Sequence, residues 1–269
     1  MLVIGENINA SNRSVAEAMS SRDRGFLQKL AIAQVAAGVD FIDINAGLGH
    51  GSQDEEIATM EWLVEVVQEA IDKPLVIDSN IPIMIETALS KYRGEGLIIN
   101  SVTAEPEKLV SIGSLAAGRQ AWLVALAMGA EGIPTSVEGR LSACDQIMAQ
   151  LARLGLEASQ IFFDPLVLPV ATNANQGMVT LKTLEQIKCR YPGTRTVMGL
   201  SNISFGLPNR GLINRAFLLM AAYAGLDAVI LNPLDAKMIS SIKVVNMLMG
   251  KDPSCRSYIR AHRKGVLIE

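Results

Sequence analysis

The chain has 269 residues, of which 49% are hydrophobic and 19% are charged, and its formal net charge is −3. This length is enough to bury one large hydrophobic core, and a slightly acidic chain without basic runs is not typical of nucleic-acid-binding proteins. No apolar run approaches the ~18 uncharged residues of a membrane span, and the first residues do not resemble a secretion signal, so we expect a cytoplasmic protein without membrane contact.

The few cysteines and histidines argue against several kinds of site. The three cysteines, Cys144, Cys189 and Cys255, are far apart, so neither a disulfide framework nor a paired-cysteine zinc site is indicated. The two histidines, His50 and His262, have no neighbours that would complete a zinc site or a Ser-His-Asp triad. We therefore expect the chain to hold no metal ion of its own.

Short apolar runs alternate with helical patterns from one end of the chain to the other. Their nearly continuous apolar character is typical of parallel strands that are covered on both faces. The runs that we predict to be strands are residues 2–5, 41–44, 74–77, 96–99, 121–127, 160–163, 195–200 and 227–231.

Amphipathic patterns between these runs predict helices. The clearest covers residues 52–71, where Ser52 and Glu55 suit a capping box and apolar residues recur on one face. Pro106 suits the first turn of another helix, and the stretch 181–191 shows a further apolar stripe. The segment 217–226, FLLMAAYAGL, is apolar nearly all round, which fits either a subunit interface or a deeply buried helix. A homodimer is the assembly that we expect.

Eight strands, each followed by a helix, predict a (β/α)₈ barrel of the α/β class. The chain has roughly the 250 residues typical of that architecture, and no linker divides it, so we expect a single domain over residues 1–269. An open doubly wound sheet is the alternative. Such a sheet more often has a glycine-rich phosphate-binding turn, and neither GxGxxG nor a P-loop motif occurs here.

Polar residues follow most of the predicted strands, at the end where barrel enzymes build their sites. They are rich in carboxylates and carboxamides and poor in lysine and arginine. This composition disfavours a phosphate ligand and favours a neutral ligand with N–H donors and ring nitrogens. The residues are Glu6, Asn7, Asn9, Asp43, Asn45, Asp78, Ser79, Asn100, Ser101, Asp164, Ser201, Asn202 and Asn232.

Asp and Asn after a strand also serve as helix caps and turn formers. We leave that explanation open for Asn7, Asp43, Asn45 and Asn232. It is weaker for four residues that directly follow an apolar strand, because a partly desolvated polar side chain requires a partner there. These four candidates are Asp78, Asn100, Asp164 and Asn202.

Several segments resemble the methyltetrahydrofolate:corrinoid protein methyltransferases, members of the pterin-binding barrel superfamily. The similarity extends over nearly the whole chain, and the DPLVLP and GLSN motifs together are specific. The matching segments include IGENIN (4–9), DINAG (43–47), IDSN (77–80), FFDPLVLP (162–169), GLSN (199–202) and NRGLINRAFL (209–218).

The resemblance implies a role for each of the four candidates. Asp78, Asn100 and Asp164 would bind the pterin ring, whose 2-amino group and N3–H form a donor pair that matches a carboxylate. Asn202 would be the catalytic residue that contacts N5. The substrate would be tetrahydrofolate or 5-methyltetrahydrofolate, and the methyl group would move between N5 and the cobalt of a corrinoid.

The same resemblance implies that the corrinoid (cobalamin) arrives on a separate protein. No DxHxxG corrinoid-binding motif occurs, so we expect that partner to dock at the barrel mouth. The direction of transfer is open: the enzyme would either methylate tetrahydrofolate during catabolism of a methylated compound or methylate a corrinoid in the acetyl-CoA pathway.

Two departures from the family pattern stand near the expected site. Asn7 occupies the place of an arginine, and Phe205 occupies the place of a glutamine. Two other functions are alternatives. Dihydropteroate synthases share the barrel, but their Ser-Arg-Lys element is absent from GLSNISFG. A non-catalytic folate-binding module would keep the pocket without turnover.

Overall fold

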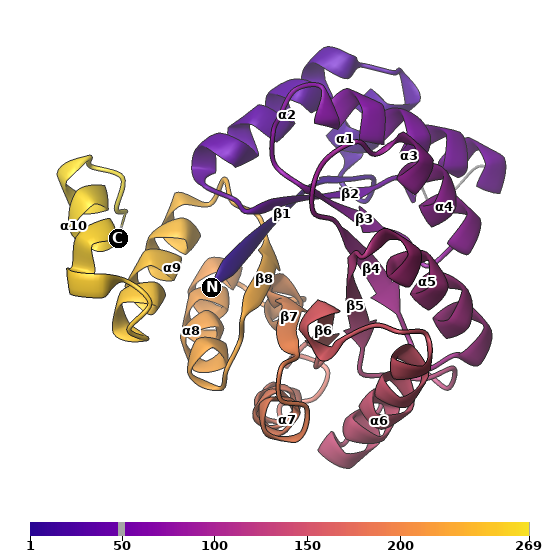
Figure 1. Ribbon diagram of the computed structural model, residues 1–269. Coiled ribbons are helices and arrows are strands. Elements are labelled where there is room, and N and C mark those ends of the chain that lie inside the picture. Colours follow the sequence, from indigo (N-terminus) through magenta and orange to yellow (C-terminus); the bar gives the residue numbers. More distant parts are fainter. Residues whose placement is uncertain (48–51, 269) are drawn as a thin grey trace.

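Eight parallel strands close into one barrel in sequence order, with β8 paired to β1 (Figure 1). The structure is a computed structural model that describes residues 1–47 and 52–268, so His50 lies outside the described residues. The closed barrel confirms the (β/α)₈ prediction and excludes the open sheet. The strands are β1 (Leu2–Asn9), β2 (Phe41–Asn45), β3 (Leu75–Asp78), β4 (Ile98–Val102), β5 (Trp122–Leu126), β6 (Ile161–Asp164), β7 (Arg195–Gly199) and β8 (Ala228–Leu231).

Helices surround the barrel, and α10 lies outside that ring, packed on α9 (Figure 1). No helix in the described ranges combines the length and apolar character needed to cross a bilayer. The helices are α1 (Arg13–Ser20), α2 (Arg24–Ala37), α3 (Gln53–Gln68), α4 (Pro82–Lys91), α5 (Pro106–Arg119), α6 (Val137–Arg153), α7 (Gln176–Arg190), α8 (Arg210–Tyr223), α9 (Ala236–Leu248) and α10 (Arg256–Arg263), with short 3₁₀ turns η1 (Ala158–Gln160), η2 (Leu200–Ser204) and η3 (Pro253–Cys255).

The local sequence signals account for the element boundaries. The predicted capping box is confirmed, since the Glu55 amide donates to Ser52 Oγ at 3.3 Å and the Ser52 amide donates to Glu55 Oε2 at 3.0 Å. Pro106 begins α5 as predicted. Strand β1 extends to Asn9, four residues beyond the prediction, because its polar second half lies past a register irregularity and interrupts the apolar run.

An apolar layer closes the inside of the barrel, with one side chain from each strand. Its members are at most 5% exposed: Ile4, Phe41, Val76, Ile98, Val124, Phe162, Val197 and Ala228. Side chains alternate along a strand, so the residues two positions further on also face inward. That next layer lies at the C-terminal end of the barrel and is mostly polar: Glu6, Asp43, Asp78, Asn100, Leu126, Asp164, Gly199 and Ile230.

The exposure of side chains on helix α8 distinguishes the two explanations for the apolar segment 217–226, a subunit interface or a deeply buried helix. Its inner face buries Phe217 and Leu218, whereas Leu219, Met220 and Tyr223 are 44%, 49% and 81% exposed. A helix buried on all sides is therefore excluded. An exposed apolar face is left on the outside of the barrel.

Candidate functional site

Three carboxyl groups from neighbouring strands meet in the polar layer, and Asp43 is the most buried of them. It is 2% exposed, and its Oδ1 has no hydrogen-bond partner in the described structure. Burial, followed by the charges of Asp78 and Glu6, raises the Asp43 pKa well above its usual range, and a hydrogen bond from Asn100 opposes that rise. Asp43 is therefore neither a helix cap nor a turn former. Its alternation with buried Phe41 is the sequence signal that would have identified it.

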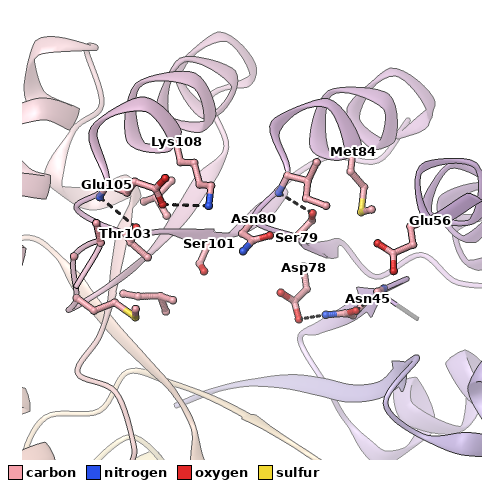
Figure 2. Close-up of a pocket in the computed structure, with 17 residues that line it drawn as sticks. Asn45, Glu56, Asp78, Ser79, Asn80, Met84, Ser101, Thr103, Glu105 and Lys108 are labelled. Atoms are coloured by element: carbon pink, nitrogen blue, oxygen red, sulfur yellow. Dashed lines mark hydrogen bonds and ion pairs between the residues drawn. The ribbon is translucent and has the colours of Figure 1, made fainter. Parts of the chain in front are cut away.

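Asp78 is held by the side chain of Asn45. The Asn45 Nδ2 donates to Asp78 Oδ2 at 2.8 Å (Figure 2), while Asn45 Oδ1 accepts from the Gly47 amide at 2.8 Å. Asn45 is thus a turn former, as the alternative explanation predicted, and also a partner of the carboxylate. Burial raises the pKa of Asp78, and the bond from Asn45 lowers it.

Asn100 lies beside Asp78, because the two residues pair in register between β3 and β4. Its carbonyl oxygen accepts a 2.7 Å hydrogen bond from the Ser79 amide, which joins the ends of the two strands. Its side chain donates to Asp43. The amide nitrogen is therefore engaged, and the amide oxygen is the group that can accept a hydrogen bond from a ligand.

Asp164 ends β6 and is 8% exposed. Its Oδ1 accepts a 2.7 Å hydrogen bond from the Leu166 amide. Burial raises the pKa of Asp164 to about 7, and the Leu166 amide and the charge of Arg140 act against that rise. At neutral pH this carboxyl is poised between its neutral and ionised forms, so small changes in its surroundings change its charge.

Asn202 differs from the prediction of a partly desolvated amide at a strand end, because it is exposed. Strand β7 already ends at Gly199, and Asn202 lies three residues further on, in the 3₁₀ turn η2. The four candidates therefore do not form one buried set. Asp78, Asn100 and Asp164 lie in the inward-facing polar layer, and Asn202 stands at the entrance to it.

A cavity of about 540 Å³ opens over the ends of β2 to β5, and Asp78 lines it (Figure 2). Asn100, Asp164 and Asn202 are outside its lining. A second hollow of about 270 Å³ lies over β7, β8 and β1, where Glu6, Ser201 and Asn232 contribute to it. The barrel mouth is thus hollowed on two sides, and the polar layer forms the floor between them.

The larger cavity is acidic. Lys108 is the single cation among the described residues that line it, and its Nζ lies 3.1 Å from Glu105 Oε2 (Figure 2). Such a lining is unsuited to phosphate groups, as the composition of the strand ends predicted. Within residues 1–47 and 52–268, no cluster of three His, Cys, Asp or Glu side chains could hold a metal ion. The absence of a bound metal stays a prediction.

Comparisons with known proteins match this architecture and carry the resemblance further. A family model described as pterin binding enzyme matches residues 5–232. The chain is 32% identical over 267 residues to the methylcorrinoid:tetrahydrofolate methyltransferase of Eubacterium limosum, which covers 98% of this chain and 97% of that protein. It is 30% identical over 246 residues to the methionine synthase of Mycobacterium leprae (strain TN), where the match covers 86% of this chain and 20% of that protein.

Solved structures share the fold. The 7,8-dihydropteroate synthase from Vibrio fischeri ES114 superposes with a TM-score of 0.73 at 20% identity, over 94% of each chain. At this identity the likeness concerns the barrel rather than the reaction. The family match over most of the chain confirms the resemblance seen in the sequence. The chain belongs to the pterin-binding enzymes.

Proposed function

We propose that this enzyme transfers a methyl group from a methylated corrinoid, bound to a separate protein, to N5 of tetrahydrofolate. The main support is a buried layer of carboxylates and one carboxamide at the floor of an open barrel mouth. Similarity along 98% of the chain to a methylcorrinoid:tetrahydrofolate methyltransferase adds to it. That name gives the methylcorrinoid as the donor, and we propose the same direction here.

In this proposal the polar layer binds the folate ring through hydrogen-bond acceptors. Asp78 and Asp164 accept from the ring N–H groups, and the amide oxygen of Asn100 accepts beside them. Each charge-assisted hydrogen bond of this kind contributes about 1.5–3 kcal/mol when it is buried. Asn45 keeps Asp78 in place, because one oxygen of that carboxylate already accepts from its side chain.

The transfer itself exchanges one bond for another. The carbon–cobalt bond breaks and leaves its electron pair on cobalt, while the lone pair of N5 forms the new bond to the methyl carbon. N5 then carries a positive charge and releases its proton to solvent. Asn202 cannot take up that proton, but its amide oxygen accepts a hydrogen bond from N5–H that strengthens as the charge develops.

The barrel mouth is the surface that the corrinoid protein would contact. Phe205, three residues after Asn202, is 64% exposed there. The guanidinium carbon of Arg210 lies 5.9 Å from its ring centroid, and Arg210 is anchored by a 2.8 Å hydrogen bond to the Ser201 carbonyl. An exposed aromatic side chain beside the residue proposed to contact N5 suits a large apolar partner such as a corrin ring.

Two further features of the protein belong to the same proposal. The exposed apolar face of α8, with Leu219, Met220 and Tyr223, suits the contact between subunits of a homodimer. The cytoplasm stays the expected location, on the sequence grounds given above.

A methyl-transfer assay tests the proposed function. The protein is incubated with tetrahydrofolate and methylcobalamin, and 5-methyltetrahydrofolate is measured by mass spectrometry alongside the absorbance of the demethylated cobalamin. We expect Asn202→Ala to lower the transfer rate by about 10- to 1000-fold while tetrahydrofolate binding changes little. Asn209→Gly is the matched control, since it removes an exposed asparagine of the same loop that already has positive φ.

The outcomes separate the three functions. Tetrahydrofolate binding without methyl transfer would identify a non-catalytic folate-binding module. Condensation of a pterin pyrophosphate with p-aminobenzoate would identify a dihydropteroate synthase. An Asn202→Ala variant with the wild-type transfer rate would remove the catalytic role from this residue.

A further inference from the structure

One arginine is completely buried, and it lies behind the site rather than in it. Arg140, on helix α6, is 0% exposed. Its guanidinium donates five hydrogen bonds, and all of them go to uncharged oxygen atoms. The acceptors are the carbonyls of Pro134 at 3.0 Å, Pro165 at 2.7 Å and Leu166 at 2.7 Å, together with Thr180 Oγ1 at 3.3 Å and Gln176 Oε1 at 2.8 Å.

A buried charge bonded only to neutral groups is unusual. Removing a guanidinium from water is costly, and replacing such a group by apolar residues is often neutral or stabilising. Hydrogen bonds to neutral oxygen atoms engage all three guanidinium nitrogens but do not neutralise its charge. A buried arginine of this kind therefore suggests a use for the positive charge or for the flat arrangement of its donors.

Two of the five bonds of Arg140 go to the two residues that follow Asp164. Its Nη1 holds the carbonyls of Pro165 and Leu166, and Thr180 Oγ1 donates to the same Leu166 carbonyl at 2.8 Å. Leu166 has positive φ, at 67°, a conformation that leucine rarely adopts. This turn aims the Leu166 amide at Asp164 Oδ1, 2.7 Å away.

Arg140 also acts on Asp164 through its charge. The charge of Arg140 lowers the pKa of Asp164, and the charge of Asp164 in turn raises the pKa of Arg140. Because the carboxyl is 8% exposed, solvent screens this attraction only weakly. The positive charge thus favours the ionised form of Asp164.

We propose that Arg140 is a positioning residue for the folate site: it holds the Pro165–Leu166 turn against Asp164 and supplies the buried positive charge that lets Asp164 accept hydrogen bonds from the ring as a carboxylate. The role of Asp164 in this statement rests on the proposed function. The turn and the charge are separate contributions, and different substitutions remove them.

Three variants of the full chain separate these contributions. Arg140→Met keeps much of the volume but removes the charge and all five bonds. Arg140→Lys keeps the charge but loses the planar fork that reaches two successive carbonyls. Thr180→Val is the matched control, because it removes the weakest of the five Arg140 bonds and the bond from Thr180 to the Leu166 carbonyl but leaves the charge and the two Arg140 bonds to the turn in place. Circular dichroism and thermal melting establish that each variant is folded.

The first measurement is the titration of the Asp164 carboxyl by carbon-13 NMR without ligand, assigned with Asp164→Asn. The midpoint should rise in Arg140→Met and stay near the wild-type value in Thr180→Val. The second is the Kd of tetrahydrofolate against pH. For each pH unit by which the Asp164 midpoint rises, tetrahydrofolate binding should weaken about tenfold at pH values below the wild-type midpoint. Arg140→Lys should bind about tenfold more weakly at about pH 8, where Asp164 is ionised, because the turn is loosened.

Distinct results would overturn the inference. A folded Arg140→Met variant with an unchanged Asp164 titration would remove the role of the charge. Wild-type affinity of Arg140→Lys at about pH 8 would remove the role of the fork. If Arg140→Met does not fold, Arg140→Lys still decides the second point. If the wild-type protein does not bind tetrahydrofolate, the proposed function fails, whereas the NMR titration still tests the link between Arg140 and Asp164.

Discussion

Asp164→Asn should stabilise the protein at neutral pH while weakening its binding of folate. The pKa of this carboxyl rises from 3.8 to about 7 because it is buried. A raised pKa in the folded state means that stability is complete below the unfolded value and is lost as the pH rises through about 7. A shift of about three units at about 1.4 kcal/mol per unit gives a loss of about 4 kcal/mol, as an upper value.

Asparagine does not titrate, and its Oδ1 can accept the same hydrogen bond from the Leu166 amide. The stability of Asp164→Asn relative to wild type should therefore increase by up to about 4 kcal/mol between about pH 4 and pH 8, with about 1 kcal/mol of that gained by pH 5. The other carboxyls of the layer with a raised pKa, Glu6, Asp43 and Asp78, are present in both proteins, so their titrations largely cancel in the comparison.

Urea unfolding at a series of pH values measures this difference. Glu95→Gln, a neutral substitution of an exposed acid, is the control and should give a nearly pH-independent difference. The same Asp164→Asn preparation should bind tetrahydrofolate more weakly than wild type, because an amide nitrogen faces ring N–H donors. A stability difference for Asp164→Asn that does not change with pH would refute the reasoning, since it would show that ionising the buried carboxyl does not destabilise the folded state.

Substitutions at three other residues test separate parts of the structure. Asp43→Asn should keep tetrahydrofolate affinity within about threefold, since asparagine imitates a protonated acid. Asp43→Leu leaves the Asn100 amide unpaired and should weaken tetrahydrofolate binding about 5- to 150-fold. Isothermal titration calorimetry measures both affinities. Asn45→Ala should raise the Kd of tetrahydrofolate about tenfold with kcat less affected, and an unchanged Kd would contradict the role of its 2.8 Å bond to Asp78. Ser52→Ala should lower the free energy of unfolding by about 0.5–2 kcal/mol without altering methyl transfer, because it removes only the cap of α3.

The order of the elements and the closed barrel could be predicted from the sequence because strand signals are local. Eight nearly continuous apolar runs, each followed by an amphipathic stretch, define the architecture without any knowledge of distant contacts. The capping box at Ser52 and the start of α5 at Pro106 are equally local. The resemblance of the strand-end motifs to a methyltransferase family also lay in the sequence alone.

Only the tertiary structure distinguishes the environments of the polar strand ends, because burial depends on residues far apart in the chain. Asp43 was one of several polar residues that could have formed a turn, and it is the most buried carboxyl of the layer. Asn202 was expected to be partly desolvated, and the 3₁₀ turn after β7 exposes it instead. Arg140 belongs to no sequence motif that we recognised. Its five hydrogen bonds to residues 6 to 40 positions away nevertheless place its charge behind Asp164. Side-chain identity sets which hydrogen bonds are possible, whereas the closing of the barrel sets which of them are made and which charges are removed from water.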